Sequence, residues 1–247
     1  MRPLLESELI KLRTTRTFYA LAGIAIALPL VFVTLGAILS EPSKESVLTD
    51  VFEVDISSLF ILILGIVGIT GEWRHRTITS SLLAAPDRIR FLAAKLLAFA
   101  AAGALLSVAI SITTAIVGYA ILGFRDQPTP EFGELLEQDG RNALVAALTG
   151  AIGIVIGSLV RNLPVAIVGV LIFGIVIDPL LGEYVPSVER YSPTGALSGA
   201  VAGYEPDEVA LGKVEFFDLI PALGLMLAWI AALYAAGAAL LVRRDVE

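Results

Sequence analysis

Asp178, in the stretch GIVIDPLLG, is the only acid placed well within an apolar run of this sequence. A carboxylate inside a membrane segment is costly, so such a residue is a candidate for a proton or cation site. Against this, Pro179 follows at once and Gly182 and Glu183 come soon after. These neighbours favour a structural interpretation, in which Asp178 already reaches the lipid headgroups.

A second group of polar residues lies in GEWRHRTITSSLLAAPDRIRFLAAK, residues 71–95, together with the only histidine, His75. Glu72 and Arg76 have the i, i+4 spacing at which helical side chains of opposite charge pair.

The middle of residues 71–95 predicts a short amphipathic helix. Ile78, Leu82 and Ala85 recur at i, i+4 and i+7, beside Leu83. Pro86 ends this helix, and the next residue, an aspartate, is suited to cap the helix that follows.

Signals for catalysis are missing from the sequence. It has no G-x-x-x-x-G-K-[ST] phosphate loop and no G-x-S-x-G nucleophile motif. It has no cysteine, and its single histidine lies beside arginines, so no cluster of metal ligands is expected. We therefore predict that the chain has no catalytic, cofactor-binding or metal-binding residues and is not itself an enzyme. We also expect no nucleic-acid partner.

Composition shows which elements must position these residues. The 247 residues are 57% hydrophobic and 17% charged, with a mean hydropathy of +0.86, which is too apolar for an ordinary soluble domain. A helix needs about 20 apolar residues to cross the hydrocarbon core of a bilayer. We predict an all-α membrane protein whose residues 1–247 form a single transmembrane domain, with spans at 18–40, 51–71, 91–123, 142–161, 163–181 and 217–242.

The distribution of Lys and Arg predicts the orientation. With both termini inside, twelve of the seventeen basic residues lie on the inner side, and eighteen of the twenty-four acids lie outside. Such a bias places both termini in the cytoplasm. Thirteen arginines against four lysines, with abundant alanine, are typical of a GC-rich prokaryotic genome. We therefore expect a multi-pass protein of a prokaryotic plasma membrane.

Three further local patterns make structural predictions. Leu5, Leu9 and Leu12 predict an amphipathic helix within residues 1–17, lying on the inner membrane surface. Ser192 as N-cap, with Pro193 first in the helix, predicts a short helix through Val201 in the last outer loop. Being too short to span, this helix is either re-entrant or an ordinary surface helix.

The hairpin between the fourth and fifth spans is predicted to be tight. Pro164 is suited to the first position of the fifth span. Gly150, Gly153 and Gly157 lie along one side of the fourth span. They either let another helix approach closely or reflect the general abundance of glycine in membrane helices.

The order of residues in 71–95 resembles the loop between the second and third spans of type-2 ABC transporter permeases. That family shows an acid, a Gly-Thr pair, two leucines, a proline-arginine element and a lysine. Arg76 stands where the family usually has glycine, and Asp87 separates the proline from the arginine. KLRTTR, LVRNLPVA and YSPTGALSGA add to the resemblance. The loop residues it implicates in coupling to an ATPase are Glu72, Arg74, Arg76, Thr77, Leu82, Leu83, Pro86, Arg88 and Lys95.

The resemblance implies half of an ATP-driven exporter core. Two permease copies would pair in the bilayer, and two separate ATP-binding cassette subunits would dock on their inner faces. Two alternatives are an ion-coupled secondary transporter using Asp178 and a membrane anchor or sensor that transports nothing. The scarcity of charge in the middle of the spans favours a lipophilic or amphipathic cargo over a small ion.

Overall fold

The computed structural model describes residues 2–52, 57–75, 77–84, 87–206 and 211–243. Within these ranges all regular structure is helical, and six helical stretches are long and apolar enough to cross a membrane. This confirms the predicted fold class at the level of an all-helical chain with six candidate spans.

The candidate spans account for most of the helices. They are α2 (Arg16–Leu39), η1 (Leu48–Phe52) with α3 (Ser57–Arg74), α5 (Arg88–Phe124), α6 (Phe132–Val160), the run α7–η2–α8 (Leu163–Ile172, Phe173–Ile177 and Asp178–Tyr184) and α11 (Leu219–Arg243). The shorter helices are α1 (Arg2–Thr14), α4 (Ile78–Ala84), α9 (Pro186–Glu189) and α10 (Ala196–Ala202).

The fourth span departs most from its predicted bounds. It begins at Phe132, ten residues before the predicted start at 142. Its extra turns are polar, and the Glu137 and Arg141 side chains pair at 2.9 Å across one helical turn. Hydropathy marks only the apolar part of a helix, so this polar extension was not predicted.

α6 is the central helix. In its most apolar stretch of 18 residues, 67% of the residues are buried, whereas the corresponding share in Leu163–Tyr184 is 22%. Glycines make close backbone packing against α3 possible, because a Cβ on Gly153 would lie 2.3 Å from the Leu62 carbonyl oxygen. A Cβ on Gly65 would likewise lie 2.6 Å from the Gly150 carbonyl oxygen. Of the two interpretations of these glycines, the structure supports the close approach of another helix.

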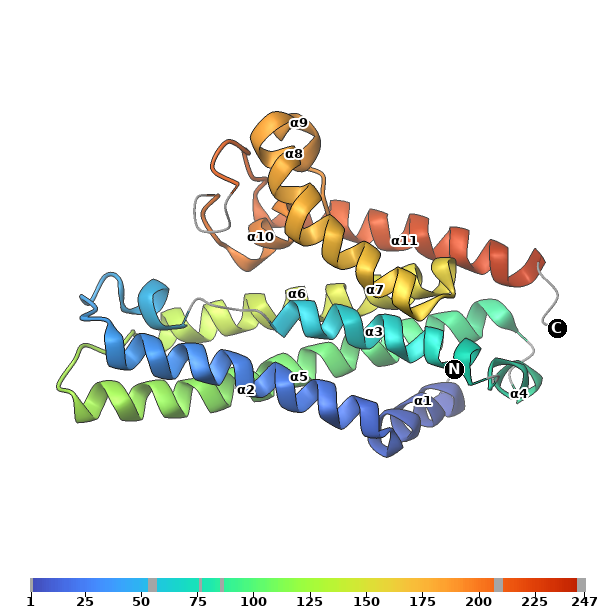
Figure 1. The fold of residues 1–247 in the computed structure, drawn as a ribbon, viewed down its shortest axis with the longest axis horizontal. Coiled ribbons are helices and arrows are strands. Elements are labelled where there is room, and N and C mark those ends of the chain that lie inside the picture. The colour runs from blue at the N-terminus through green and yellow to red at the C-terminus, as the bar shows by residue number, and fades with distance from the viewer. Residues whose placement is uncertain (1, 53–56, 76, 85–86, 207–210, 244–247) are drawn as a thin grey trace.

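The two ends of the bundle differ in what they carry (Figure 1). α1, α4 and the C-terminal part of α11 lie at one end, called the α4 end below. The α2–η1 connection and the α5–α6 turn lie at the opposite end.

α7 begins at Leu163 as predicted, but the position of Pro164 within it and the predicted start of α10 are wrong. Asn162 caps α7 by accepting a hydrogen bond from the Val165 amide at 3.2 Å, so Pro164 is the second helical residue and not the first. α10 starts at Ala196 and not at Pro193. The Ser192 hydroxyl lies in the turn before α10, where it donates to Asp178 at 2.8 Å and accepts from the Gly195 amide at 3.4 Å.

Candidate functional site

Lys95 is a buried lysine in α5 and anchors a cluster of charges at the α4 end. Its side chain is 1% exposed. Its ammonium group donates to Glu8 Oε2 at 2.5 Å and to Glu72 Oε1 at 3.0 Å. The ammonium also lies 5.5 and 5.9 Å from the ring centroids of Phe91 and Phe99, where aromatic faces attract a cation.

Lys11 completes the cluster from α1. Its ammonium donates to Glu8 Oε1 at 2.7 Å and to Glu72 Oε1 at 2.8 Å. A third contact, 3.3 Å to the Ser81 hydroxyl, reaches α4. The four side chains of Glu8, Lys11, Glu72 and Lys95, called the charge cluster below, sum to zero charge and connect α1, α3, α4 and α5.

Local sequence explains how the charge cluster is held. Glu8 and Lys11 are three residues apart and share one face of α1, while Glu72 lies at the end of α3. The Asp87 side chain caps α5 by accepting from the Arg90 amide at 3.0 Å, as predicted, so Lys95 lies two turns inside that helix.

The buried face of α1 differs from the predicted leucine stripe. Glu8 and Leu12 are buried, whereas Leu9 is 42% exposed. The helix packs against α5, so it is turned to place its acid on Lys95. Glu8 and Lys11 were therefore missed as site residues. The i, i+3 spacing of Glu8 and Lys11 was the only sequence signal for them.

Ion pairing and burial act in opposite directions on the titration of Glu8 and Lys11. Burial alone would raise the pKa of Glu8, but the charges and hydrogen bonds of Lys95 and Lys11 outweigh it and lower that pKa. Burial alone would lower the pKa of Lys11, but Glu72 and Glu8 outweigh it and raise that pKa. Both groups are therefore held in their charged forms.

A cavity of about 520 Å³ adjoins the charge cluster. All four cluster side chains line it, together with apolar side chains such as Phe18, Leu64 and Phe99. Among the described residues no group of three or more His, Cys, Asp or Glu side chains could hold a metal ion.

α4 has one buried apolar side chain, Ile78, and one exposed apolar side chain, Leu83. Ile78 is buried in a small cluster with Phe91 and Leu241, with Trp73 against it. Leu83 is 79% exposed. Leu82 belongs to α4, but its side chain lies outside what the structure describes, as do Arg76 and Pro86 entirely.

Five other predicted loop residues can be placed. Glu72 and Lys95 meet in the charge cluster, and the Thr77 amide donates to the Glu72 carbonyl at 3.0 Å. Arg88 donates to the Leu241 carbonyl at 2.5 Å, so it holds the last turn of α11. Arg74 is exposed at the end of α3, away from the cluster.

Arg161 makes a related contact from the α6–α7 hairpin. Its backbone is left-handed, with φ 55°, which reverses the chain in the tight turn predicted there. Its guanidinium lies 4.2 Å from the Trp73 ring centroid and donates to the Leu240 carbonyl at 3.3 Å. α3, α6 and α11 are thereby joined at the α4 end.

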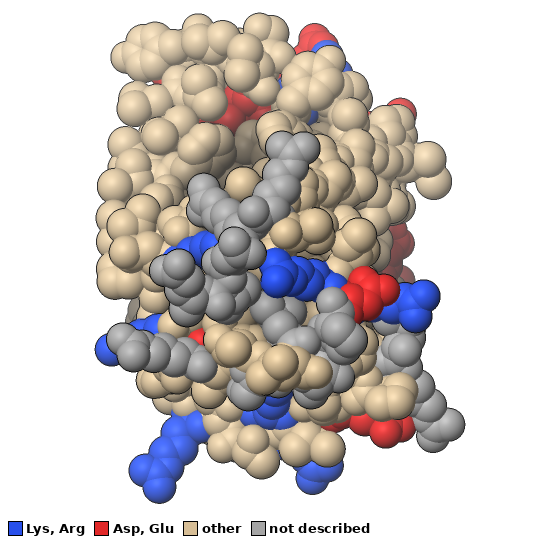
Figure 2. Space-filling view, turned by 90° about the vertical axis from the view of Figure 1, so that its right-hand side faces the viewer, with Lys and Arg blue, Asp and Glu red and all other residues tan. Residues whose placement is uncertain are grey.

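The surface of the α4 end is rich in basic side chains (Figure 2). Those exposed to solvent among the described residues include Arg13, Arg16, Arg74 and Arg90. A basic surface around an exposed leucine suits an acidic protein partner or anionic headgroups.

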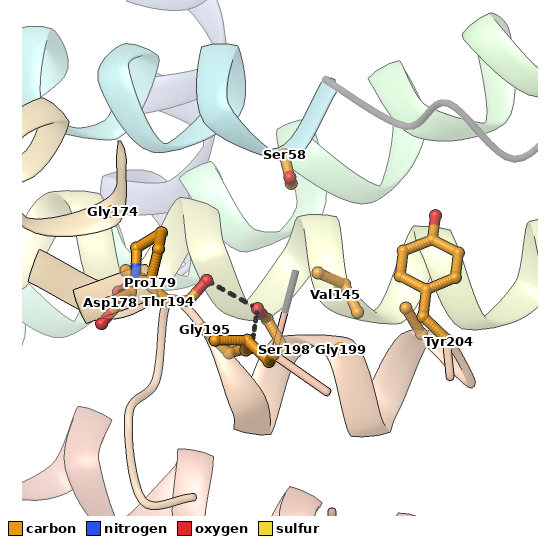
Figure 3. A pocket seen from close by; sticks show the side chains of 12 residues that line it. Ser58, Val145, Gly174, Asp178, Pro179, Thr194, Gly195, Ser198, Gly199 and Tyr204 are labelled. Atoms are coloured by element: carbon orange, nitrogen blue, oxygen red, sulfur yellow. Dashed lines mark hydrogen bonds between the residues drawn. The ribbon is translucent and has the colours of Figure 1, made fainter. Parts of the chain in front are cut away.

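Asp178 lies elsewhere, at the start of α8, and is 2% exposed. Its two carboxylate oxygens accept from the Ser192 hydroxyl at 2.8 Å and from the Thr194 hydroxyl at 2.6 Å. It lines a second cavity, of about 210 Å³, on the same side as Thr194 (Figure 3). The carboxyl group of Glu189 lies beside it and was not predicted, because no spacing rule connects residues on two short helices.

No protein-family model matches the chain. No curated protein sequence matches it either.

Proposed function

We propose that this chain is the membrane-spanning permease subunit of an ATP-driven exporter of the type-2 ABC class, in a prokaryotic plasma membrane. In this proposal both termini and α4 face the cytoplasm, and ATP hydrolysis occurs in a separate ATP-binding cassette subunit. The proposal rests on the resemblance of residues 71–95 and on the way those residues are connected.

The single observation that carries the proposal is the buried contact of Lys95 with Glu72 and Glu8. Glu72 and Lys95 lie on either side of α4 in the sequence, and their side chains meet at 3.0 Å. Lys11 extends the connection to α4 itself through Ser81. A force applied to α4 would therefore reach α1, α3 and α5 through one buried network, as a coupling element requires.

The surface of α4 supports a protein partner. Leu83 is a large apolar side chain that is 79% exposed at the basic end of the bundle. A leucine here gains from being covered, and the surrounding arginines favour a partner surface carrying acids. We assign this surface to the ATP-binding subunit.

The bilayer-facing sides support pairing of two permease copies and an apolar cargo. Of the 18 most apolar consecutive residues of Leu163–Tyr184, only 22% are buried in the protein, and for α11 the share is 28%. A groove of about 890 Å³ lies between them, lined by residues such as Ile156, Val170 and Phe173. Its lining suits a lipophilic or amphipathic cargo.

The proposal is tested by purifying the tagged chain with its partners from its own membrane and measuring ATP hydrolysis in proteoliposomes. Wild type is compared with Leu83→Asp and with Phe124→Asp, a change at a side chain that is 91% exposed at the opposite end. We expect Leu83→Asp to lower the co-purified ATPase activity about tenfold or more, and Phe124→Asp to leave it unchanged.

Two results would count against the proposal. One is the absence of any co-purified ATPase, and the other is an equal loss in the two variants. Uptake driven by an ion gradient, without ATP or a second subunit, would instead support secondary transport through Asp178.

A further inference from the structure

The carboxyl groups of Asp178 and Glu189 lie together under a cap formed by α8, α9, residues 190–195 and α10. A Cβ placed on Gly195 would lie 1.9 Å from Glu189 Oε1 and 3.2 Å from Asp178 Cγ. The two acids therefore share one small space, which only a residue without a side chain can border at position 195. Glu189 is fully buried and Asp178 is 2% exposed.

The hydrogen bonds of this pair leave one oxygen without a donor. Asp178 accepts from Ser192 and Thr194, and Glu189 Oε1 accepts from the Ala196 amide at 3.3 Å. No donor among the described residues reaches Glu189 Oε2, which is buried. A buried carboxylate oxygen without a donor is costly, whereas a protonated Glu189 carboxyl group has a hydrogen to donate to the adjacent carboxylate of Asp178.

No basic side chain among the described residues forms an ion pair with either acid. Arg190 follows Glu189 directly, but its guanidinium lies 4.0 Å from the Phe217 ring centroid. Lys213 pairs with Glu183, and Arg141 pairs with Glu137 on α6. The remaining charged or titratable described groups of residues 178–206 and 211–218 are Tyr184, Tyr191, Tyr204, Glu205, Glu215 and Asp218. Of the neighbouring helices, α6 also carries Glu134 and Asp139 and α11 carries Tyr234, whereas α7, η2 and α10 contribute none.

We propose that Asp178 and Glu189 form a proton-binding site, in which one proton shared between the two carboxyl groups holds the cap closed. With the proton bound, Glu189 on α9 donates to Asp178 on α8, and Ser192 and Thr194 bring the start of α10 to the same carboxylate. Loss of the proton leaves two adjacent buried anions, whose repulsion separates α9 from α8.

The pH of this change follows from the surroundings of Glu189. Burial, followed by the negative charge of Asp178, raises the pKa of Glu189 to about 8. The cap is therefore closed at neutral pH and opens as the pH rises past that value. This inference is independent of the proposed transport function, because it concerns only groups within the chain.

The chain carries its own reporter for the opening. Trp229 Nε1 on α11 donates to the Tyr191 carbonyl at 2.9 Å, two residues beyond Glu189. The sequence has two tryptophans, and Trp73→Phe leaves Trp229 as the only one while keeping a ring for Arg161 to stack on. The experiment records tryptophan emission of Trp73→Phe protein in lipid nanodiscs from pH 6 to 9.5.

We expect a reversible change in emission with a midpoint near pH 8. Glu189→Gln should abolish the change, since its amide donates to Asp178 at every pH. Asp178→Asn should move the midpoint to lower pH, since Glu189 loses the neighbouring negative charge that raises its pKa. The Trp73→Phe protein, in which Asp178 and Glu189 are unchanged, gives the pH dependence of emission even if a substituted variant does not fold.

Three outcomes would overturn the proposal. The first is a flat emission profile between pH 6 and 9.5 in the Trp73→Phe protein. The second is the same midpoint after Glu189→Gln. The third is a midpoint that moves when Na⁺ or Ca²⁺ is added at constant ionic strength, because the site would then bind a metal cation in place of the proton.

Discussion

Lys95 Nζ lies 2.5 Å from Glu8 Oε2, although the two residues are 87 positions apart in the sequence. Both side chains are buried, and each is also bonded to another member of the charge cluster. The first helix of the chain is thereby fixed to the helix that follows the proposed coupling segment.

Removing the charge of Lys95 should destabilise the fold strongly. Lys95→Met leaves Glu8 and Glu72 with Lys11 as their only ion-pair partner among the described residues, and breaking a buried ion pair on one side typically costs about 3–5 kcal/mol. The free energy of unfolding in mixed micelles measures the effect. The matched control is Lys213→Met, which removes an exposed lysine paired with Glu183 and should cost less than about 1 kcal/mol. Equal losses in the two variants would show that the cluster is not a stabilising network.

The charge cluster should also make stability depend on pH at both extremes. The pKa of Glu8 is lowered, so its contribution is present above about its ordinary value of 4.5 and is lost as the pH falls through the folded-state value. The pKa of Lys11 is raised, so its contribution is present below its ordinary value of 10.5 and is lost as the pH rises through the folded-state value. The free energy of unfolding measured across this pH range should fall at both the acid and the alkaline end. Glu8→Gln should remove the decrease at the acid end. An unchanged acid limb in Glu8→Gln would contradict the assignment.

The packing of α3 against α6 predicts a third result. Gly153→Ala would place a Cβ 2.3 Å from the Leu62 carbonyl oxygen and 3.0 Å from Gly65 Cα, so the helices must move apart. Such overpacking costs about 1–3 kcal/mol. Gly169→Ala in α7 is the control, because nothing lies within 4 Å of its added Cβ, and alanine should leave stability unchanged or raise it slightly. Thermal unfolding of the two variants compares them directly, and a neutral Gly153→Ala would contradict the close packing.

Much of the fold was predictable because the lipid bilayer restricts which structures can cross it. A bilayer demands long apolar helices, so five of the six spans have nearly the predicted bounds. The cap at Asp87 was predictable for a similar reason, since capping is local in sequence. The start of α6 at Phe132 was not, because its first turns are polar and are held by helical pairs such as Glu137 with Arg141.

The candidate site was predictable only where its residues are close in sequence. The order of residues in 71–95 indicated Glu72 and Lys95, and these two do meet. Glu8 and Glu189 were missed because their contacts depend on how separate helices pack, which no local pattern encodes. The packing of α1 was missed for the same reason, because the contact of Glu8 with Lys95 of α5 decides which face of the helix is buried.

The most direct test of the central claim is cross-linking from α4. The chain has no cysteine, so Leu83→Cys and the control Phe124→Cys each introduce a single reactive thiol at an exposed position. Each variant is treated with a thiol-reactive photo-cross-linker in membranes from its own host, with and without a non-hydrolysable ATP analogue. We predict that Leu83→Cys, and not Phe124→Cys, is joined to a subunit that hydrolyses ATP, with a yield that changes when nucleotide binds. A cross-linked partner without ATPase activity, or the same products from both positions, would contradict the account.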